Sequence, residues 1–190
     1  MTTTHQRRAL RPALGLIALA LVGLAFIATT TTASAQDQGV SSWKHRTTER
    51  LVVRGESTVL DSGCDATGCD IEFADGAFRG TPVGTGAYTG NLRLDFTGVF
   101  PNGEGGVCAP IAGNIVLGAG SPDRLVLAVS GDSCQDGAGD PTTTSFTALA
   151  DVTVKYGTGK YAGARGNGIL TSSEGADDRD RMTVIGRISL

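Results

Sequence analysis

Residues 146–156, FTALADVTVKY, show the alternation that decides the fold. Apolar side chains occupy every second position, at Phe146, Ala148, Ala150, Val152, Val154 and Tyr156, with polar Thr147, Asp151, Thr153 and Lys155 between them. Successive side chains of a β-strand point to opposite faces of a sheet. This period of two therefore predicts a strand with one buried and one solvated face.

The same period recurs in residues 88–96 and 182–190. Weaker candidates are residues 49–60, 69–78, 111–118, 124–131 and 163–172, which bring the expected number of strands to eight. Residues 118–123, GAGSPD, are dense in turn formers and predict a hairpin between the apolar runs on either side. No window of 11 residues carries a helical period.

Eight such strands predict one all-β domain from residue 49 to residue 190. We expect an antiparallel barrel, with a β-sandwich as the alternative, because closure removes exposed sheet edges. Of the 28 glycines, 26 lie between Gly39 and Gly186, a composition that argues against a helical bundle. A chain of roughly 150 residues is large enough to bury a single core without a partner.

The first 35 residues have the three parts of a secretory signal peptide. A basic head (residues 5–12) precedes an uncharged apolar run (residues 13–28), and Ala33 and Ala35 place small residues before Gln36. The apolar run is shorter than the roughly 20 residues that a spanning helix needs. We therefore expect cleavage after Ala35 and secretion of the remaining chain to the extracellular space.

The mature chain is expected to be acidic. Loss of Arg7, Arg8 and Arg11 leaves 13 of the 16 Lys and Arg residues against 19 Asp and Glu, a net charge of −6. This balance argues against nucleic acid and anionic membrane as default partners. Residues 36–48 are polar and aperiodic, which predicts a flexible N-terminal arm.

Four cysteines remain after cleavage, Cys64, Cys69, Cys108 and Cys134. An even number in an exported chain predicts disulfides, and three pairings are possible. We favour Cys64 with Cys69 and Cys108 with Cys134, because each pair brackets a segment that would fold back as a hairpin. A zinc site is disfavoured by the cysteine spacing and the near absence of histidine, so we expect no metal and no cofactor.

A heptapeptide occurs twice. Residues 84–90, GTGAYTG, recur as residues 157–163, GTGKYAG. In each copy the glycines suit a tight turn, and Tyr88 or Tyr161 is expected to cover one end of the core. A duplicated half-barrel or two independent turns would both produce this pattern.

The second copy continues as Gly163-Ala164-Arg165-Gly166, and residues 157–170, GTGKYAGARGNGIL, resemble the turn and strand G-T-G-x-F-x-x-A-R-G of dirigent proteins and of the related allene oxide cyclase barrel. The resemblance covers about 14 residues and agrees with eight strands. It implies a central cavity in which polar side chains bind or steer a small molecule. Arg165 lies on a matching position, and Tyr161 stands where the family usually has Phe.

Arg165, Tyr161 and Tyr88 are therefore the candidate ligand-binding residues. For Arg165 the alternative is an outward side chain at the start of a strand. For both tyrosines the alternative is a structural position at the end of the core.

Other chemistry finds little support in the sequence. GTGKYA matches a dinucleotide-binding string, but no helix is expected after it. The mature chain has a single histidine, His45, which disfavours a catalytic triad. The acidic groups Asp132, Asp136 and Asp140, and Glu174, Asp177, Asp178 and Asp180, match no calcium loop and are expected to be solvated.

Two function hypotheses follow. The first is a non-catalytic protein that binds a small apolar or phenolic molecule, or that interacts through its surface. The second is a dirigent-like or cyclase-like protein that steers a reaction in its cavity, with Arg165 polarising the substrate. The apolar faces of the three clearest strands carry few titratable residues, which favours the first.

Overall fold

The computed structural model describes residues 47–135, 145–175 and 177–190. The predicted signal peptide (residues 1–35) and nearly all of the predicted arm (residues 36–48) lie outside these ranges. So do Asp136 and Asp140. Within the described ranges, no helix is long and apolar enough to cross a membrane.

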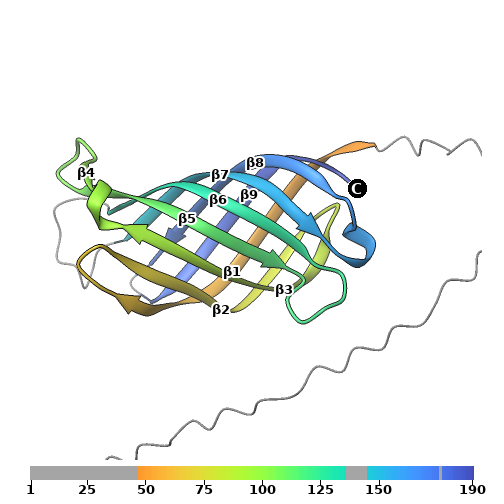
Figure 1. Ribbon diagram of the computed structural model, residues 1–190, viewed down its shortest axis with the longest axis horizontal. Helices are drawn as coiled ribbons and strands as arrows, with labels where there is room; N and C mark the ends of the chain where they lie inside the picture. Colours follow the sequence, from red (N-terminus) through yellow and green to blue (C-terminus); the bar gives the residue numbers. More distant parts are fainter. Residues whose placement is uncertain (1–46, 136–144, 176) are drawn as a thin grey trace, which may run out of the picture. The chain divides into compact units, whose positions relative to one another are not determined.

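The fold is a closed antiparallel β-barrel (Figure 1). Its eight long strands are β1 (Thr48–Cys64), β2 (Gly68–Thr81), β3 (Gly84–Asp95), β5 (Val107–Leu117), β6 (Leu125–Gln135), β7 (Phe146–Gly157), β8 (Arg165–Glu174) and β9 (Arg179–Ser189). All eight predicted strands are confirmed, mostly with longer bounds. The short β4 (Phe100–Pro101) and the 3₁₀ turns η1 (Phe96–Gly98) and η2 (Gly159–Tyr161) were not predicted.

Two pairings close the sheet. β1 pairs with β9 along its length, from Thr48 opposite Ser189 to Thr58 opposite Arg179. β3 pairs with β5, from Tyr88 opposite Leu117, and β4 continues beside β5 where β3 has ended. The barrel, not the alternative sandwich, is therefore the fold, and every long strand has a partner on both sides.

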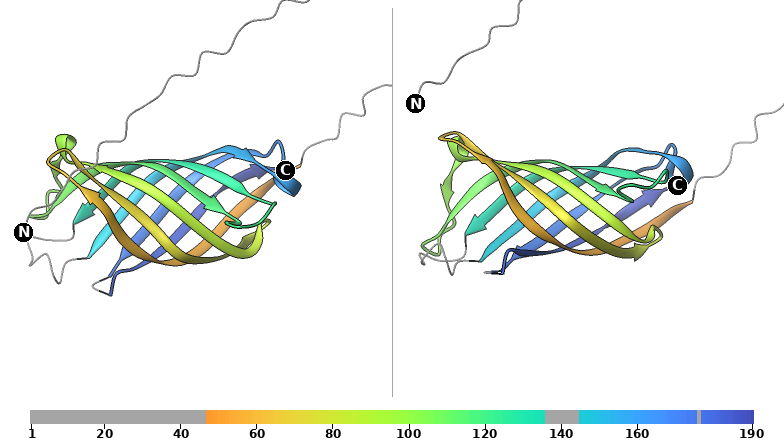
Figure 2. Two further views of the ribbon diagram at one scale, coloured as in Figure 1. Left: turned by 60° about the horizontal axis from the view of Figure 1, so that its bottom comes forward. Right: turned by 90° about the horizontal axis from the view of Figure 1, so that it is seen from below.

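The strands tilt across the barrel, so their connections gather at two ends (Figure 2). We call them the disulfide end and the η2 end. The disulfide end carries the β1–β2 and β8–β9 turns, and the η2 end carries the β2–β3, β5–β6 and β7–β8 connections. The predicted hairpin at residues 118–123 is confirmed as the β5–β6 turn.

Both predicted disulfides are confirmed, Cys64 with Cys69 and Cys108 with Cys134. In each pair the two cysteines stand directly opposite each other on neighbouring antiparallel strands. The first closes the β1–β2 turn, and the second joins the start of β5 to the end of β6. The described residues contain no free cysteine.

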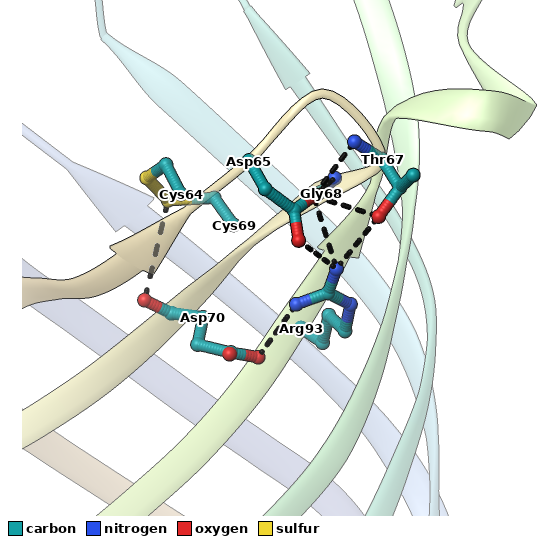
Figure 3. The surroundings of a disulfide bond; sticks show 7 residues. All are labelled: Cys64, Asp65, Thr67, Gly68, Cys69, Asp70 and Arg93. Atoms are coloured by element: carbon teal, nitrogen blue, oxygen red, sulfur yellow. Dashed lines mark hydrogen bonds and ion pairs between the residues drawn. A yellow bond between two sulfur atoms is a disulfide. The ribbon is translucent and has the colours of Figure 1, made fainter.

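A carboxylate organises the turn that Cys64–Cys69 closes (Figure 3). Asp65 Oδ1 accepts hydrogen bonds from the backbone nitrogen and hydroxyl of Thr67, both 2.7 Å away, and from the backbone nitrogen of Gly68. The guanidinium of Arg93 on β3 lies 3.4 Å from Asp65 Oδ1 and 3.2 Å from Asp70 Oδ1. The Thr67 hydrogen bonds are the main reason that the pKa of Asp65 falls to about 2.

Candidate functional site

The barrel interior was the first place predicted for a site, and large side chains fill it. Aromatic rings lie against glycines on neighbouring strands: Tyr88 stands opposite Gly76, and Phe73 opposite Gly90. A Cβ atom added to Gly76 would lie 2.6 Å from the Tyr88 ring, and one added to Gly90 would lie 2.6 Å from the Phe73 ring. The missing side chains therefore make the room that the rings occupy.

Aliphatic side chains fill the rest of this core. Leu125, Leu127, Val53, Val184 and Ile188 are completely shielded from solvent. They come from β6, β1 and β9, so the core extends across the barrel from wall to wall.

Tyr161 closes the η2 end. Its side chain is buried, and its hydroxyl donates a 2.7 Å hydrogen bond to the carbonyl oxygen of Val83 in the β2–β3 turn. Thr158 also ties the β7–β8 connection to the β5–β6 turn, because its hydroxyl donates to the carbonyl of Pro122 and accepts from the backbone nitrogen of Arg124. The turns at this end thus hold one another in place.

The interior contains a few polar groups. Ser57, Tyr88 and Asp180 are almost fully shielded from solvent. The Ser57 and Tyr88 hydroxyls lie near each other without forming a well-aligned hydrogen bond, and neither has another partner in the described part of the chain. Burial raises the pKa of Tyr88 to about 12 and that of Asp180 to about 6.

Near the disulfide end, a small cavity borders this polar region. It is lined by Ile71, Phe73, Leu92, Ile111, Ser133, Phe146, Ala148, Ser172, Glu174 and Asp180. Its volume is about 40 Å³. A cavity of this size has room for water, whereas pockets for small organic ligands are typically about 300 to 1,000 Å³.

The structure does not bring the three predicted ligand-binding residues together. Tyr88 is buried in the interior of the barrel, and Tyr161 covers the η2 end of the core. The Arg165 side chain is exposed at the start of β8. The two heptapeptides also differ in structure, since residues 84–90 lie within β3 whereas residues 157–163 contain η2 and the turn after it.

Arg165 lines an open groove on the outside of the barrel. The last β7–β8 pair is Thr153 opposite Asn167, so the strands separate beyond it. The groove of about 570 Å³ at this point is lined by Val154, Tyr156 and Arg165, among others. Tyr156 is 53% exposed, so an aromatic ring and a guanidinium border the same concavity.

Two further grooves lie over β1, β2 and β9, and both are bordered by arginines. One, of about 540 Å³, includes Arg54, Arg79 and Arg181. The other, of about 470 Å³, includes Arg50 and Arg187.

Sequence reasoning missed this group of arginines. Arg50 and Arg54 do lie an even number of positions apart in a predicted strand, which indicates that they share one face. The approach of the arginines across neighbouring strands depends on the register, which the sequence does not disclose.

The acidic residues are dispersed in the structure. Asp132 is exposed on β6, and Asp177 and Asp178 are exposed in the β8–β9 turn. Asp180 is buried, contrary to the expectation of a solvated cluster, because it falls on the inward parity of β9 with Met182 and Val184. Within the described ranges, no group of three or more His, Cys, Asp or Glu side chains could hold a metal ion.

Comparison with protein-family models, curated proteins and solved structures found no match. The fold defines the class of protein: a closed eight-stranded antiparallel β-barrel with two disulfides.

Proposed function

We propose that this protein is exported and acts as a non-catalytic binding protein that contacts its partner through the outer surface of the barrel. The observation that carries this proposal is the position of the polar and aromatic candidates. Tyr88 and Tyr161 are packed into the core, whereas Arg165 and the neighbouring Tyr156 border an outer groove. Because the interior is filled, the polar and aromatic side chains that can contact a partner are those on the outer surface.

Two observations support export. The first 35 residues have the organisation of a secretory signal peptide. The two disulfides fit an oxidising compartment such as the extracellular space.

Native mass spectrometry of the protein secreted from its own host tests the proposal. The denatured, unreduced mass is expected to equal that of residues 36–190 less four hydrogens, and the native mass is expected to equal the denatured mass. Small apolar and phenolic compounds added before the measurement are expected to leave the native mass unchanged. A small molecule that denaturation releases would contradict the proposal and favour a dirigent-like protein that works through its cavity.

A matched variant establishes that the assay can detect an internal ligand. Leu127 is completely buried, so Leu127→Ala would open an apolar cavity of the kind that binds small aromatic compounds. Uptake by this variant and not by the wild-type protein is the expected result. Equal uptake by both proteins would show that the native barrel already has an accessible cavity.

A further inference from the structure

Two pairs of arginines stand directly opposite each other on the outside of the barrel. Arg54 of β1 faces Arg79 of β2, and Arg50 of β1 faces Arg187 of β9. All four side chains are exposed. Arg50 and Arg54 point outward because Leu51 and Val53, which lie between them at the inward positions of β1, are buried in the core. Buried Phe78 and Ile188 stand next to Arg79 and Arg187 in the same way. We call these four residues the arginine face.

No ion pair neutralises the arginine face within residues 47–135, 145–175 and 177–190. Of the two carboxylates beside these arginines, Glu56 has its Oε1 3.1 Å from Nη2 of Arg179 and 3.9 Å from Nη2 of Arg181 instead. Glu49, which lines the second groove, forms no ion pair in the part of the chain that the structure describes. Like charges directly opposite on adjacent strands destabilise a sheet. An anion bound from outside would relieve this repulsion in both pairs.

The shape of this surface suits oxyanions. Arg54 and Arg79 border the groove of about 540 Å³, and Arg50 and Arg187 border the groove of about 470 Å³. A guanidinium offers a planar fork of donors that matches a carboxylate in bidentate fashion. Each groove therefore provides two such forks for one acidic group, beside a single carboxylate of the protein, Glu56 in the first groove and Glu49 in the second.

The spacing of the pairs points to an extended ligand. Arg50 and Arg54 are four residues apart on β1, roughly 13 Å along an extended strand. Between the two pairs lie Val52 and Ile185, which face each other on the outer surface, and Ile185 is 49% exposed. A ligand that reaches both pairs must place acidic groups roughly 13 Å apart and must have apolar surface between them that can cover this row.

We propose that the arginine face binds an acidic polysaccharide whose carboxylate groups occupy the two arginine-lined grooves. This inference rests on the proposed function and names the class of partner for the outer surface. Sugar rings supply apolar C–H surface between their acidic groups, which suits Val52 and Ile185. Duplex DNA carries one charge per roughly 1.7 Å, and the acidic chain repels so dense a polyanion more strongly than a polysaccharide with at most one carboxylate per sugar. A flat anionic membrane fits the convex barrel wall less well than a flexible chain does.

Polygalacturonate is the probe, and dextran is its uncharged counterpart. The secreted mature protein is expected to bind polygalacturonate and not dextran, and its affinity is expected to fall with added salt because exposed charges are screened. The double variants Arg54→Gln/Arg79→Gln and Arg50→Gln/Arg187→Gln are each expected to bind about tenfold more weakly. The variant with all four substitutions is expected to show no measurable binding.

The matched control is Arg124→Gln/Lys160→Gln. It removes the same charge from two exposed residues that line neither arginine groove, one next to β6 and one in η2. Binding within about twofold of the wild type is expected. Thermal unfolding of the face variants is expected at or above the wild-type temperature, since each substitution pair removes a repulsion.

Three results would overturn the inference. One is equal binding to polygalacturonate and dextran. Another is an equal loss of affinity in the control and face variants, which would show that only the net charge of the protein matters. The third is equal or tighter binding to duplex DNA or to phosphatidylglycerol vesicles. If any of these occurs while native mass spectrometry shows a bare chain, the inference about the arginine face is wrong and the outer-surface proposal stands. A released small molecule would contradict that broader proposal itself.

Discussion

The hydroxyl of Tyr161 donates a hydrogen bond of 2.7 Å to the carbonyl oxygen of Val83, a residue 78 positions earlier in the chain. This bond joins the β7–β8 connection to the β2–β3 turn and covers the η2 end of the core, where both residues are buried. Tyr88, at the matching position of the other heptapeptide, is equally buried, but its hydroxyl has no well-aligned partner in the described part of the chain. The same residue type therefore has two different environments in one barrel.

Replacing each tyrosine by Phe should separate these environments. Tyr161→Phe leaves the Val83 carbonyl without its donor, so the free energy of unfolding should fall by about 1 to 2 kcal/mol. Tyr88→Phe removes an unsatisfied hydroxyl and should leave stability within about 0.5 kcal/mol of the wild type or raise it. Urea unfolding of the disulfide-intact proteins measures both values. A larger loss for Tyr88→Phe than for Tyr161→Phe would contradict this assignment.

The packing of Tyr88 against glycine predicts a coupled pair of substitutions. A Cβ atom at Gly55 would lie 2.8 Å from both the Tyr88 ring and the Met182 side chain. Gly55→Ala should therefore destabilise the barrel by about 1 to 3 kcal/mol through overpacking. The penalty should be smaller when Tyr88→Leu removes the edge of the ring, and a double-mutant cycle measures this coupling.

Gly63→Ala on the same strand is the control for that cycle. Nothing lies within 4 Å of a Cβ atom at Gly63, so stability should change by no more than about 0.5 kcal/mol. An equal cost at Gly55 and Gly63 would show that crowding by Tyr88 is not the cause.

The sequence predicted the strands and the disulfides because both leave a local signal. The alternation in residues 146–156 became β7 (Phe146–Gly157), and hairpin folding brought Cys108 opposite Cys134. The pairing of β3 with β5, which closes the barrel, leaves no such signal. The segment between these two strands contains only η1 and the short β4, which show no alternation in the sequence.

The candidate site could be predicted only in part. Tyr161 was expected at an end of the core, and its position there agrees with that structural alternative. The arginine face depends on which residues stand opposite each other on β1, β2 and β9, and a shift of one residue in register would remove it. Register is a property of two paired strands, so the sequence of one strand alone does not predict it.

The two disulfides should differ in their contribution to stability. In the chain-entropy model, the loop between Cys108 and Cys134 stabilises by about 3 to 4 kcal/mol and the short loop between Cys64 and Cys69 by about 2 kcal/mol. Paired Cys→Ser variants of each bond should lower the free energy of unfolding in this order, as measured in urea without reductant. The reverse order would show that the local turn, with its Asp65 hydrogen bonds, depends more strongly on its disulfide.

Buried Asp180 should make the stability of the barrel depend on pH between about pH 4 and 6. Burial raises the pKa of this carboxyl from 3.8 to about 6, so the folded chain holds its proton over a range where the unfolded chain has lost it. Stability is consequently lost as the pH rises from about 4 through 6, by up to about 3 kcal/mol. Asp65, whose pKa is lowered to about 2, acts in the opposite direction only at more acidic pH.

Asp180→Asn should remove this dependence, because the amide keeps the shape of the carboxyl and does not ionise. The variant should be more stable than the wild type at pH 7.5, and the difference should shrink as the pH falls below about 6 towards pH 4.5. Urea unfolding between these limits measures the difference, and carboxyl carbon NMR of the native protein should show Asp180 titrating near pH 6. A stability difference that stays constant with pH, together with an Asp180 titration near 4, would contradict the burial argument.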